Sequence, residues 1–429
     1  MGPVGGAEDA EASGAARVRW HAFDVRSGSP QPTTDWSDTD QVFVTNRPPL
    51  RSQASGFVPR YRGVVGELVG RGPTSLVVVV ERARGIDPRE LAGRLADELA
   101  DVRFVVIAVL GAPERPWARA LHAASAAGRG GLRWPEGGPG PDAVVLAAHL
   151  PMAPLVLASP SGAGGFLLEE GFHRLDARSD ASARVLGWLA DRRAQRVLQR
   201  IRRDGRPVIV LTEAERQHFG RWLPADQVHV VPLWVDPAEL PAIPDGARAA
   251  GSPFVVGCVG RLADRRTAEP LVAVIEEARR SGRSWRWVLV GSDPSSALQR
   301  LAEDRPDVVQ VTGRVPDVGP FYGEVDAVLV PAASTTGTKT TLLQPWAAGR
   351  PVVASPAAAR SAGAVDGESV LTFSTPSEAV AQLARLADGP ELGRRLVAAG
   401  RAETVARDGV RASRRIVDLA LGGASVDPG

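Results

Sequence analysis

The amino-acid sequence predicts an α/β protein with two Rossmann-like domains that face a central cleft. Two observations support this fold class. Short, continuous apolar runs alternate with helical stretches along most of the chain, which is the pattern of parallel strands buried on both faces. A stretch with five prolines and no strong periodicity, His229–Pro253, separates two such alternating regions.

The composition limits the kind of protein. The 429 residues are enough for two domains, and 44% of them are hydrophobic. The net charge is only +2 and there is no long basic run, so we expect no nucleic-acid partner. Cys258 is the single cysteine, which excludes an internal disulfide and a cysteine metal cluster. We expect Cys258 to be a small buried residue.

The first 38 residues are rich in Gly, Ala, Ser, Pro and Asp, and we predict a disordered tail over residues 1–38. This tail has acidic residues and no apolar centre, so it does not resemble a secretory signal. No apolar run approaches the ~20 residues that span a bilayer. We therefore expect a cytoplasmic protein. The preference for arginine over lysine is typical of a GC-rich genome such as that of an actinomycete.

The first alternating region defines an N-terminal domain over residues 39–235. A helix is predicted at Asp87–Ala100, where an Asp-Pro pair gives a start signal. A second helix, Ser182–Arg203, has an arginine-rich face that is either simply solvated or in contact with anionic lipid head groups. Strands are predicted at Asp40–Pro49, Thr74–Arg82, Asp101–Gly111, Pro141–His149 and Arg206–Glu215.

A linker over residues 236–253 leads to a second domain over residues 254–405, where the alternation starts again. Residues 406–429 are assigned to a C-terminal helix and tail. Strands of the second domain are predicted at Phe254–Arg261, Trp285–Gly291, Val308–Arg314, Ala327–Pro331 and Arg350–Ser355.

The stretch "TTGTK", Thr335–Lys339, has the features of a phosphate-binding turn. It follows a predicted strand and precedes a predicted helix, where backbone N–H groups and the helix dipole attract an anion. Thr338 or Thr340 is suited to cap that helix. Lys339 is the only lysine of the sequence, which favours a role in holding phosphate over chance survival.

A second predicted strand ends at Gly260 and Arg261, with Arg266 about a turn later. Because the carboxyl ends of parallel strands meet at one edge of a sheet, these arginines are expected to reach the same anion. Glycine-rich turns are also common for purely structural reasons. The combination of several such pieces in one domain therefore carries more weight than any one of them.

From about Ser182 to Ala420 the sequence resembles the family 4 (group 1) retaining glycosyltransferases, which have the GT-B fold. Four segments carry the resemblance: "VHVVPLWVDP", "VGRLADRR", "VTGRVPD" and "GTKTTLLQPWAAGRPVVAS". The first ~180 residues match only in outline. The resemblance implies transfer of a sugar from a nucleoside-diphosphate donor to an acceptor hydroxyl with retention of configuration. It also implies that neither a metal nor another cofactor is needed.

The resemblance assigns roles to individual residues. Arg261 and Lys339 would hold the donor diphosphate and act in catalysis, and the second glutamate of the family is replaced by Gln344, which would contact the ribose. His149 would be a catalytic residue on the acceptor side, or else a structural histidine. The remaining donor-site residues are Gly260, Arg266, Arg314, Val315, Thr336, Gly337 and Thr338, where Thr336 replaces the first glutamate of the family. Gly56 is a further candidate, because it would let the backbone approach a substrate, although loop flexibility explains this glycine equally well.

Two other functions remain open from the sequence. The same fold serves nucleotide-sugar epimerases and coupling enzymes. The loss of both glutamates also fits a non-catalytic paralogue that binds a nucleotide or serves as a partner subunit. The expected partners are a nucleotide-sugar donor and an unknown acceptor, and peripheral contact with a membrane stays possible.

Overall fold

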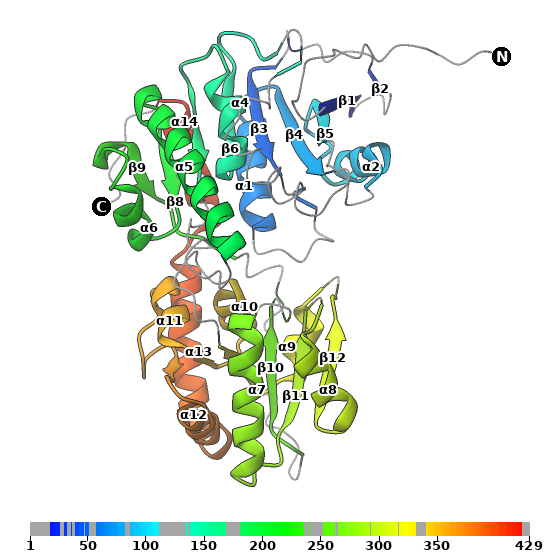
Figure 1. Cartoon of the computed structure of the whole chain (residues 1–429), viewed down its shortest axis with the longest axis vertical. Helices are drawn as coiled ribbons and strands as arrows, with labels where there is room; N and C mark the ends of the chain where they lie inside the picture. Colours follow the sequence, from blue (N-terminus) through cyan, green and yellow to red (C-terminus); the bar gives the residue numbers. More distant parts are fainter. Residues whose placement is uncertain are drawn as a thin grey trace, which may run out of the picture.

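The computed structural model consists of two α/β halves stacked along the long axis of the molecule (Figure 1). It describes residues 18–25, 30–31, 36, 39–46, 48–50, 57–81, 86–110, 134–135, 138–168, 181–235, 240, 252–260, 262, 265–291, 293–315, 317–331 and 340–422. Each half contains one sheet, so the predicted α/β fold class is confirmed.

The sheet of the first domain has the order β2-β1-β5-β4-β3-β6-β7-β8-β9 among the described residues. Its strands from β5 to β9 are parallel, whereas β1 runs antiparallel to β5. The chain order reverses between β3 and β6, which makes this pair the topological switch point. The strands are β1 (Val18–Asp24), β2 (Pro30–Gln31), β3 (Gln41–Thr45), β4 (Thr74–Glu81), β5 (Phe104–Leu110), β6 (Val144–Ala148), β7 (Gly164–Leu167), β8 (Val208–Val210) and β9 (Val228–Val230).

Strand β1 corrects the prediction that residues 1–38 form a disordered tail. It pairs along its whole length with β5, from Val18 opposite Leu110 to Asp24 opposite Phe104. Phe23 and its neighbour Ala22 are buried against the first domain. The polar composition of the whole N-terminal segment hides this short strand, because its apolar residues are few.

Helices cover both faces of the first sheet. On one face, α1 (Val58–Val69), α2 (Pro88–Glu98) and α14 (Gly409–Ala420) share an apolar core with the strands. On the other face lie η2 (Leu150–Met152), α4 (Ala153–Leu157), α5 (Ala181–Asp204) and α6 (Glu213–Phe219). The predicted Asp-Pro start of α2 is confirmed, since the Asp87 carboxylate accepts a hydrogen bond from the Arg89 N–H.

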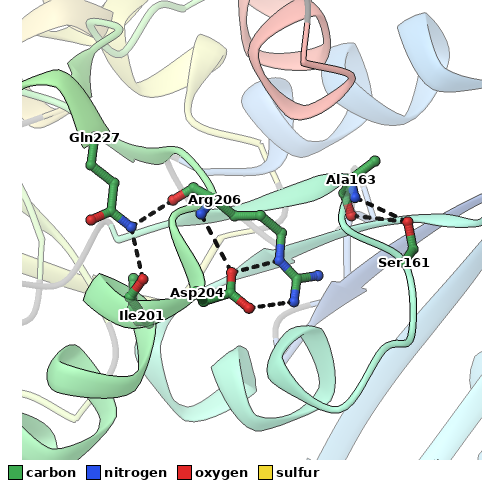
Figure 2. Close-up of polar contacts among 6 residues, drawn as sticks. All are labelled: Ser161, Ala163, Ile201, Asp204, Arg206 and Gln227. Carbon is green, nitrogen blue, oxygen red and sulfur yellow. Dashed lines mark hydrogen bonds and ion pairs between the residues drawn. The ribbon is translucent and has the colours of Figure 1, made fainter.

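Polar contacts fix the end of α5 against the neighbouring strands (Figure 2). Both carboxylate oxygens of Asp204 accept hydrogen bonds from Arg206, each at 2.6 Å. The Gln227 amide donates to the carbonyls of Ile201 and Arg206 at 2.8 and 2.9 Å. At the turn before β7, the Ser161 hydroxyl accepts from the Ala163 N–H at 3.0 Å. The contacts of Asp204 and Gln227 hold the end of α5 beside the starts of β8 and β9.

The sheet of the second domain has the order β12-β11-β10-β13-β14-β15, and its pairs are all parallel. Its switch point lies between β10 and β13. Cys258 in β10 is buried, as expected. The strands are β10 (Val255–Val259), β11 (Arg286–Val290), β12 (Val309–Gly313), β13 (Ala327–Val330), β14 (Val352–Ala354) and β15 (Leu371–Thr372). The helices are α7 (Arg265–Arg280), α8 (Ser296–Asp304), α9 (Gly319–Glu324), α10 (Thr340–Ala348), α11 (Pro356–Ala362), α12 (Pro376–Asp388) and α13 (Pro390–Val405).

After α13 the chain returns to the first domain, where α14 packs against α1 (Figure 1). Trp234 lies at this connection, between Gly63 of α1 and Gly409 of α14. A Cβ atom added at Gly409 would lie only 2.4 Å from the Trp234 ring, so the close packing requires glycine there. Arg60 donates to the Val231 carbonyl at 2.9 Å and stacks over the Trp234 ring.

None of the helices in the described ranges combines the length and the apolar character that crossing a membrane requires.

Candidate functional site: the carboxyl edges of the two sheets

The carboxyl ends of the two sheets face each other across the junction of the domains (Figure 1). In open parallel sheets, ligands bind beyond these ends at the switch point. Gly260 directly follows β10, and residues 332–339 connect β13 to α10. Gly260 after β10 and Thr340 at the start of α10, the described residues next to the two predicted phosphate segments, therefore follow the two strands of the switch point of the second sheet.

Several predicted site residues lie outside the described residues, namely Gly56, Arg261, Thr336, Gly337, Thr338 and Lys339. Arg266 is the second residue of α7, but its side chain is also outside the described part. The roles of these residues stay predictions.

Three adjacent strands of the second sheet end in glycine. Gly260 follows β10, Gly291 follows β11, and Gly313 ends β12. Backbone hydrogen bonds tie this row together, since the Gly260 N–H donates to Val290 at 3.0 Å and the Gly291 N–H donates to Gly313 at 2.9 Å. A Cβ atom at Gly291 would lie 1.9 Å from the Gly260 carbonyl oxygen. We call this row of three residues the glycine edge.

The glycine edge offers main-chain groups rather than side chains to a ligand. The sequence analysis identified Gly260 but missed Gly291 and Gly313 as site residues. Gly291 carried a signal, because it ends the apolar run of β11, and glycine at such a position marks close approach of backbone. Gly313 ends a strand that contains the polar residues Gln310 and Thr312, so its signal was weaker.

Arg314 and Val315 follow Gly313 directly, so the structure brings them together with Gly260 at one edge. The Arg314 side chain is exposed. Val315 is half-buried and packs against the apolar core beside α9 and α10. Its backbone is therefore held in place, which suits a contact made through main-chain groups.

Helix α10 fixes the far end of the segment that carries Lys339. Leu342, Leu343 and Trp346 are fully buried, and the Trp346 indole donates to the Ser369 carbonyl at 3.0 Å. Gly400 of α13 lies against the Trp346 ring, where an added Cβ would come within 2.4 Å. The helix N-terminus at Thr340 is thus anchored at the switch point, and its free N–H groups favour an anion.

Gln344 lies one turn after Thr340 on α10 and is half-buried. Its side-chain oxygen accepts a hydrogen bond from the Tyr322 hydroxyl, with 3.5 Å between the two oxygens. Burial, with a smaller effect of Cys258, raises the pKa of Tyr322, so that its phenol stays a donor. This contact orients the Gln344 oxygen toward α9.

His149 lies at the switch point of the first sheet, directly after β6. Its φ angle of 72° is rare for a residue with a side chain. Its N–H donates to the Leu167 carbonyl at 2.8 Å, and its carbonyl accepts from the Met152 N–H at 3.0 Å. The imidazole Nε2 lies 2.7 Å from the Tyr61 hydroxyl of α1, which places it in hydrogen-bond contact.

Aromatic rings fill the space around His149. Phe57 and Tyr61 each contact the imidazole edge to face, with ring centroids 5.9 and 6.0 Å apart. His149 is 2% exposed, and Tyr61 is fully buried. The imidazole is therefore shielded from solvent in this conformation. The prediction that His149 acts on the acceptor stays a prediction, and its contacts also fit the structural alternative.

A cluster of three or more His, Cys, Asp or Glu side chains that could hold a metal ion does not occur within the described ranges. The feature that could hold an anionic cofactor or substrate is the helix N-terminus at Thr340, while the glycine edge, whose Gly260 and Gly291 N–H groups bond within the sheet, leaves room for a ligand to approach.

A family model described as "Glycosyl transferases group 1" matches residues 253–388. The match covers most of the second domain and none of the first. This match confirms the resemblance seen in the sequence, although over a shorter range than the predicted Ser182–Ala420. No curated protein sequence matches the chain.

Solved structures resemble the chain over most of its length. Sucrose-phosphate synthase from Thermosynechococcus elongatus has a TM-score of 0.61 at 16% identity, covering 89% of this chain and 98% of its own. HepE from Anabaena, in complex with UDP and glucose, has a TM-score of 0.58 at 13% identity, covering 88% and 98%. TarM has a TM-score of 0.53 at 13% identity, and the similarity covers 71% of this chain but only 58% of TarM. The chain thus has the GT-B fold, as predicted.

Proposed function

We propose that this protein is a glycosyltransferase that moves a sugar from a nucleoside diphosphate to an acceptor hydroxyl, with retention of configuration and without a metal ion. The main support for this proposal is that the family match over residues 253–388 contains the whole glycine edge and both segments that flank the switch point. A nucleotide bound there has its diphosphate next to the N-terminus of α10.

The chemistry requires stabilisation of a leaving group. As the bond between the sugar and the diphosphate breaks, negative charge grows on the departing phosphate. Lys339 and Arg261 belong to the segments on either side of the switch point and are proposed to neutralise this charge. Cations placed in advance at such a site contribute several kcal/mol to catalysis. In the retaining reaction, the departing diphosphate accepts the proton of the acceptor hydroxyl while that oxygen bonds to the sugar on the same face.

The first domain is proposed to bind the acceptor. Its switch-point edge is made of side chains, including Phe57, Tyr61 and His149. Such an edge selects its ligand by shape and hydrogen bonding. The choice of acceptor therefore depends on side chains, whereas the proposed donor site depends largely on main-chain groups.

A second candidate function is nucleotide binding without catalysis. It is favoured by Thr336 and Gln344, which occupy the places of the two glutamates in the resemblance. Threonine lacks the charge and reach of glutamate, whereas glutamine still forms hydrogen bonds. The two functions differ in sugar transfer, not in nucleotide binding.

A thermal-shift experiment with UDP, GDP, ADP and TDP tests the donor site. HepE was solved with UDP and glucose, which makes UDP the first nucleotide to try. A nucleotide at 100 times its dissociation constant stabilises the protein by roughly 2.7 kcal/mol. We expect one nucleotide to stabilise the wild type, and Lys339→Ala to lose most of this gain. If no nucleotide stabilises the wild type, the proposal is wrong.

Slow hydrolysis of the matching nucleotide sugar then separates the two candidates. Water takes the place of the acceptor, and NMR identifies the first anomer that appears. A retaining transferase releases the sugar with the configuration of the donor. Nucleotide binding without any release of sugar would favour the non-catalytic function.

A further inference from the structure

The connection between the domains contains a groove that the donor site does not explain. It has a volume of about 360 Å³ and lies between the segment Val230–Pro232, after β9, and the start of α14. Arg407, Arg411 and Arg415 line it together with Asp408. We call these four residues and the facing segment the arginine groove.

The three arginines are spaced four residues apart, so Arg411 and Arg415 lie on one face of α14. Like charges at this spacing repel each other in a helix. Within the described part of the chain, none of the three has a carboxylate within ion-pair distance. Arg414, on another face of the same helix, does form an ion pair, with 3.7 Å between its Nε and the Glu67 Oε1.

Asp408 is the one acid among the described residues that line the groove, and its carboxylate is already engaged. It caps α14, where it accepts hydrogen bonds from the N–H groups of Val410 and Arg411 at 2.8 and 3.1 Å. The helix N-terminus therefore offsets much of its charge. The groove keeps an excess of positive charge.

Arg407 has a buried donor without a partner among the described residues. Its two terminal nitrogens donate to the carbonyls of Leu233 and Ala362, the first at 3.4 Å. Its Nε is buried and has no hydrogen-bond partner in the described part of the structure. Burial lowers the pKa of Arg407, with a smaller opposing effect of Glu403. A desolvated cation that bonds only to neutral carbonyls is costly unless an anion joins it.

A larger hollow on the other side of Arg407 provides a contrast. It measures about 660 Å³ and is lined by Arg62 and Glu67 of α1. Arg62 forms an ion pair with Glu98 at 2.8 Å, and Glu67 forms one with Arg71 at 2.8 Å. Arg62 and Glu67 are therefore paired with oppositely charged neighbours, unlike the arginines of the arginine groove.

We propose that the arginine groove binds the phosphate group of a small molecule or of a lipid head group. The guanidinium groups of Arg411 and Arg415 offer forked donors that suit phosphate oxygens, and Arg407 adds a third positive charge beside them. The volume is at the lower end of the range for ligand pockets, which suits a small phosphorylated compound. The site is separate from the proposed donor site, because it adjoins β9 of the first sheet and not the β10–β13 switch point.

Calorimetric titration with inorganic pyrophosphate tests this proposal. The Lys339→Ala variant serves as background, so that the proposed donor site does not contribute. In this background, Arg411→Gln/Arg415→Gln is compared with Arg395→Gln/Arg414→Gln, which removes the same charge from exposed positions outside the groove. We expect at least ten-fold weaker binding in the first double variant and less than two-fold change in the control. Equal binding by both, or no binding to the Lys339→Ala protein, would overturn the proposal.

Two further arms identify the source of the phosphate. Glycerol 3-phosphate competes with pyrophosphate if the ligand is a small molecule. Vesicles of phosphatidylcholine with phosphatidic acid sediment the protein if the ligand is a lipid, and vesicles without phosphatidic acid do not. In either case Arg411→Gln/Arg415→Gln should abolish the competition or the sedimentation. An effect that persists in this variant contradicts the proposal.

His229 of β9 is a local reporter of the groove. Its pKa is lowered by burial and, to a smaller extent, by the charge of Arg415, while Asp226 acts in the opposite direction. A phosphate bound at Arg415 offsets that charge, so the pKa of His229 should rise when pyrophosphate binds. NMR titration measures this change, and Arg411→Gln/Arg415→Gln should abolish it. Stabilisation by the donor nucleotide should remain in the double variant, which separates this proposal from the proposed function.

Discussion

The second sheet ends in glycines at its switch-point edge, whereas the first sheet ends in packed aromatic side chains. Gly260, Gly291 and Gly313 leave the main chain bare. In the first domain, the imidazole of His149 is enclosed by Phe57 and bonded to Tyr61. Both edges occupy the same place in a Rossmann-like sheet, yet they offer different groups to a ligand.

This difference indicates a division of labour between the domains. An edge of bare backbone lets a phosphate-bearing ligand approach the main chain closely, so it requires the absence of side chains. An edge made of side chains selects a ligand by shape and hydrogen bonds. Substitutions should therefore act by steric intrusion at the glycine edge and by lost contacts around His149.

The largest effect is expected for Gly291→Ala. The new Cβ would lie 1.9 Å from the Gly260 carbonyl oxygen, so the backbone of the glycine edge must shift. Overpacking of this kind costs about 1–3 kcal/mol of stability. We expect a lower thermal midpoint and loss of most of the stabilisation by nucleotide in the thermal-shift assay.

Gly323→Ala is the matched control for this substitution. Gly323 lies in α9, and an added Cβ meets no atom within 4 Å. Alanine in a helix is more stable than glycine by about 1 kcal/mol. The control should keep its nucleotide binding, and a Gly291→Ala protein that binds nucleotide normally would break the comparison.

An intermediate effect is expected for Tyr61→Phe. This change leaves the buried His149 without the hydroxyl that lies 2.7 Å from its Nε2. An unsatisfied buried polar group costs about 1–3 kcal/mol. The urea midpoint of the first domain should fall, while stabilisation by nucleotide should not change, because the nucleotide is assigned to the other sheet. A loss of nucleotide binding equal to that of Gly291→Ala would contradict the assignment.

The smallest effect is expected for Gln344→Glu. The Tyr322 hydroxyl then donates to a carboxylate, and hydrogen bonds to charged groups are stronger by about 1 kcal/mol. Because the carboxylate can also accept from ribose hydroxyls, nucleotide affinity should rise about five-fold. Titration calorimetry measures the gain, and Tyr322→Phe in the same background should reduce it. Because the pKa of Tyr322 lies above its ordinary value of 10.0, the gain should persist up to that pH.

The second domain could be predicted from the sequence in more detail than the first. Its strands β10, β11, β13 and β14 contain short apolar runs, and the order of "VGRLADRR", "VTGRVPD" and "GTKTT" predicted the edge at which these strands end. The importance of Gly291 was missed, because the need for glycine there comes from a contact with Gly260, which lies 31 positions earlier in the chain. A single sequence does not show which strands are neighbours.

Long-range packing explains the other differences. Strand β1 is held by its pairing with β5. The paired residues, such as Val18 and Leu110, lie more than 70 positions apart in the chain. The return of α14 to the first domain depends on Trp234, Gly63 and Gly409, which lie in three separate parts of the chain. The partner of His149 is Tyr61, 88 residues away. Local patterns predict elements, but they do not predict which of them meet.

Hydrogen exchange with and without the stabilising nucleotide tests the central claim that this ligand is held at the glycine edge. The account predicts slower exchange in peptides that contain Gly260, Gly291 and Gly313, and little change in peptides that contain Tyr61 and His149. Protection confined to the first domain, or spread equally over both edges, would contradict it.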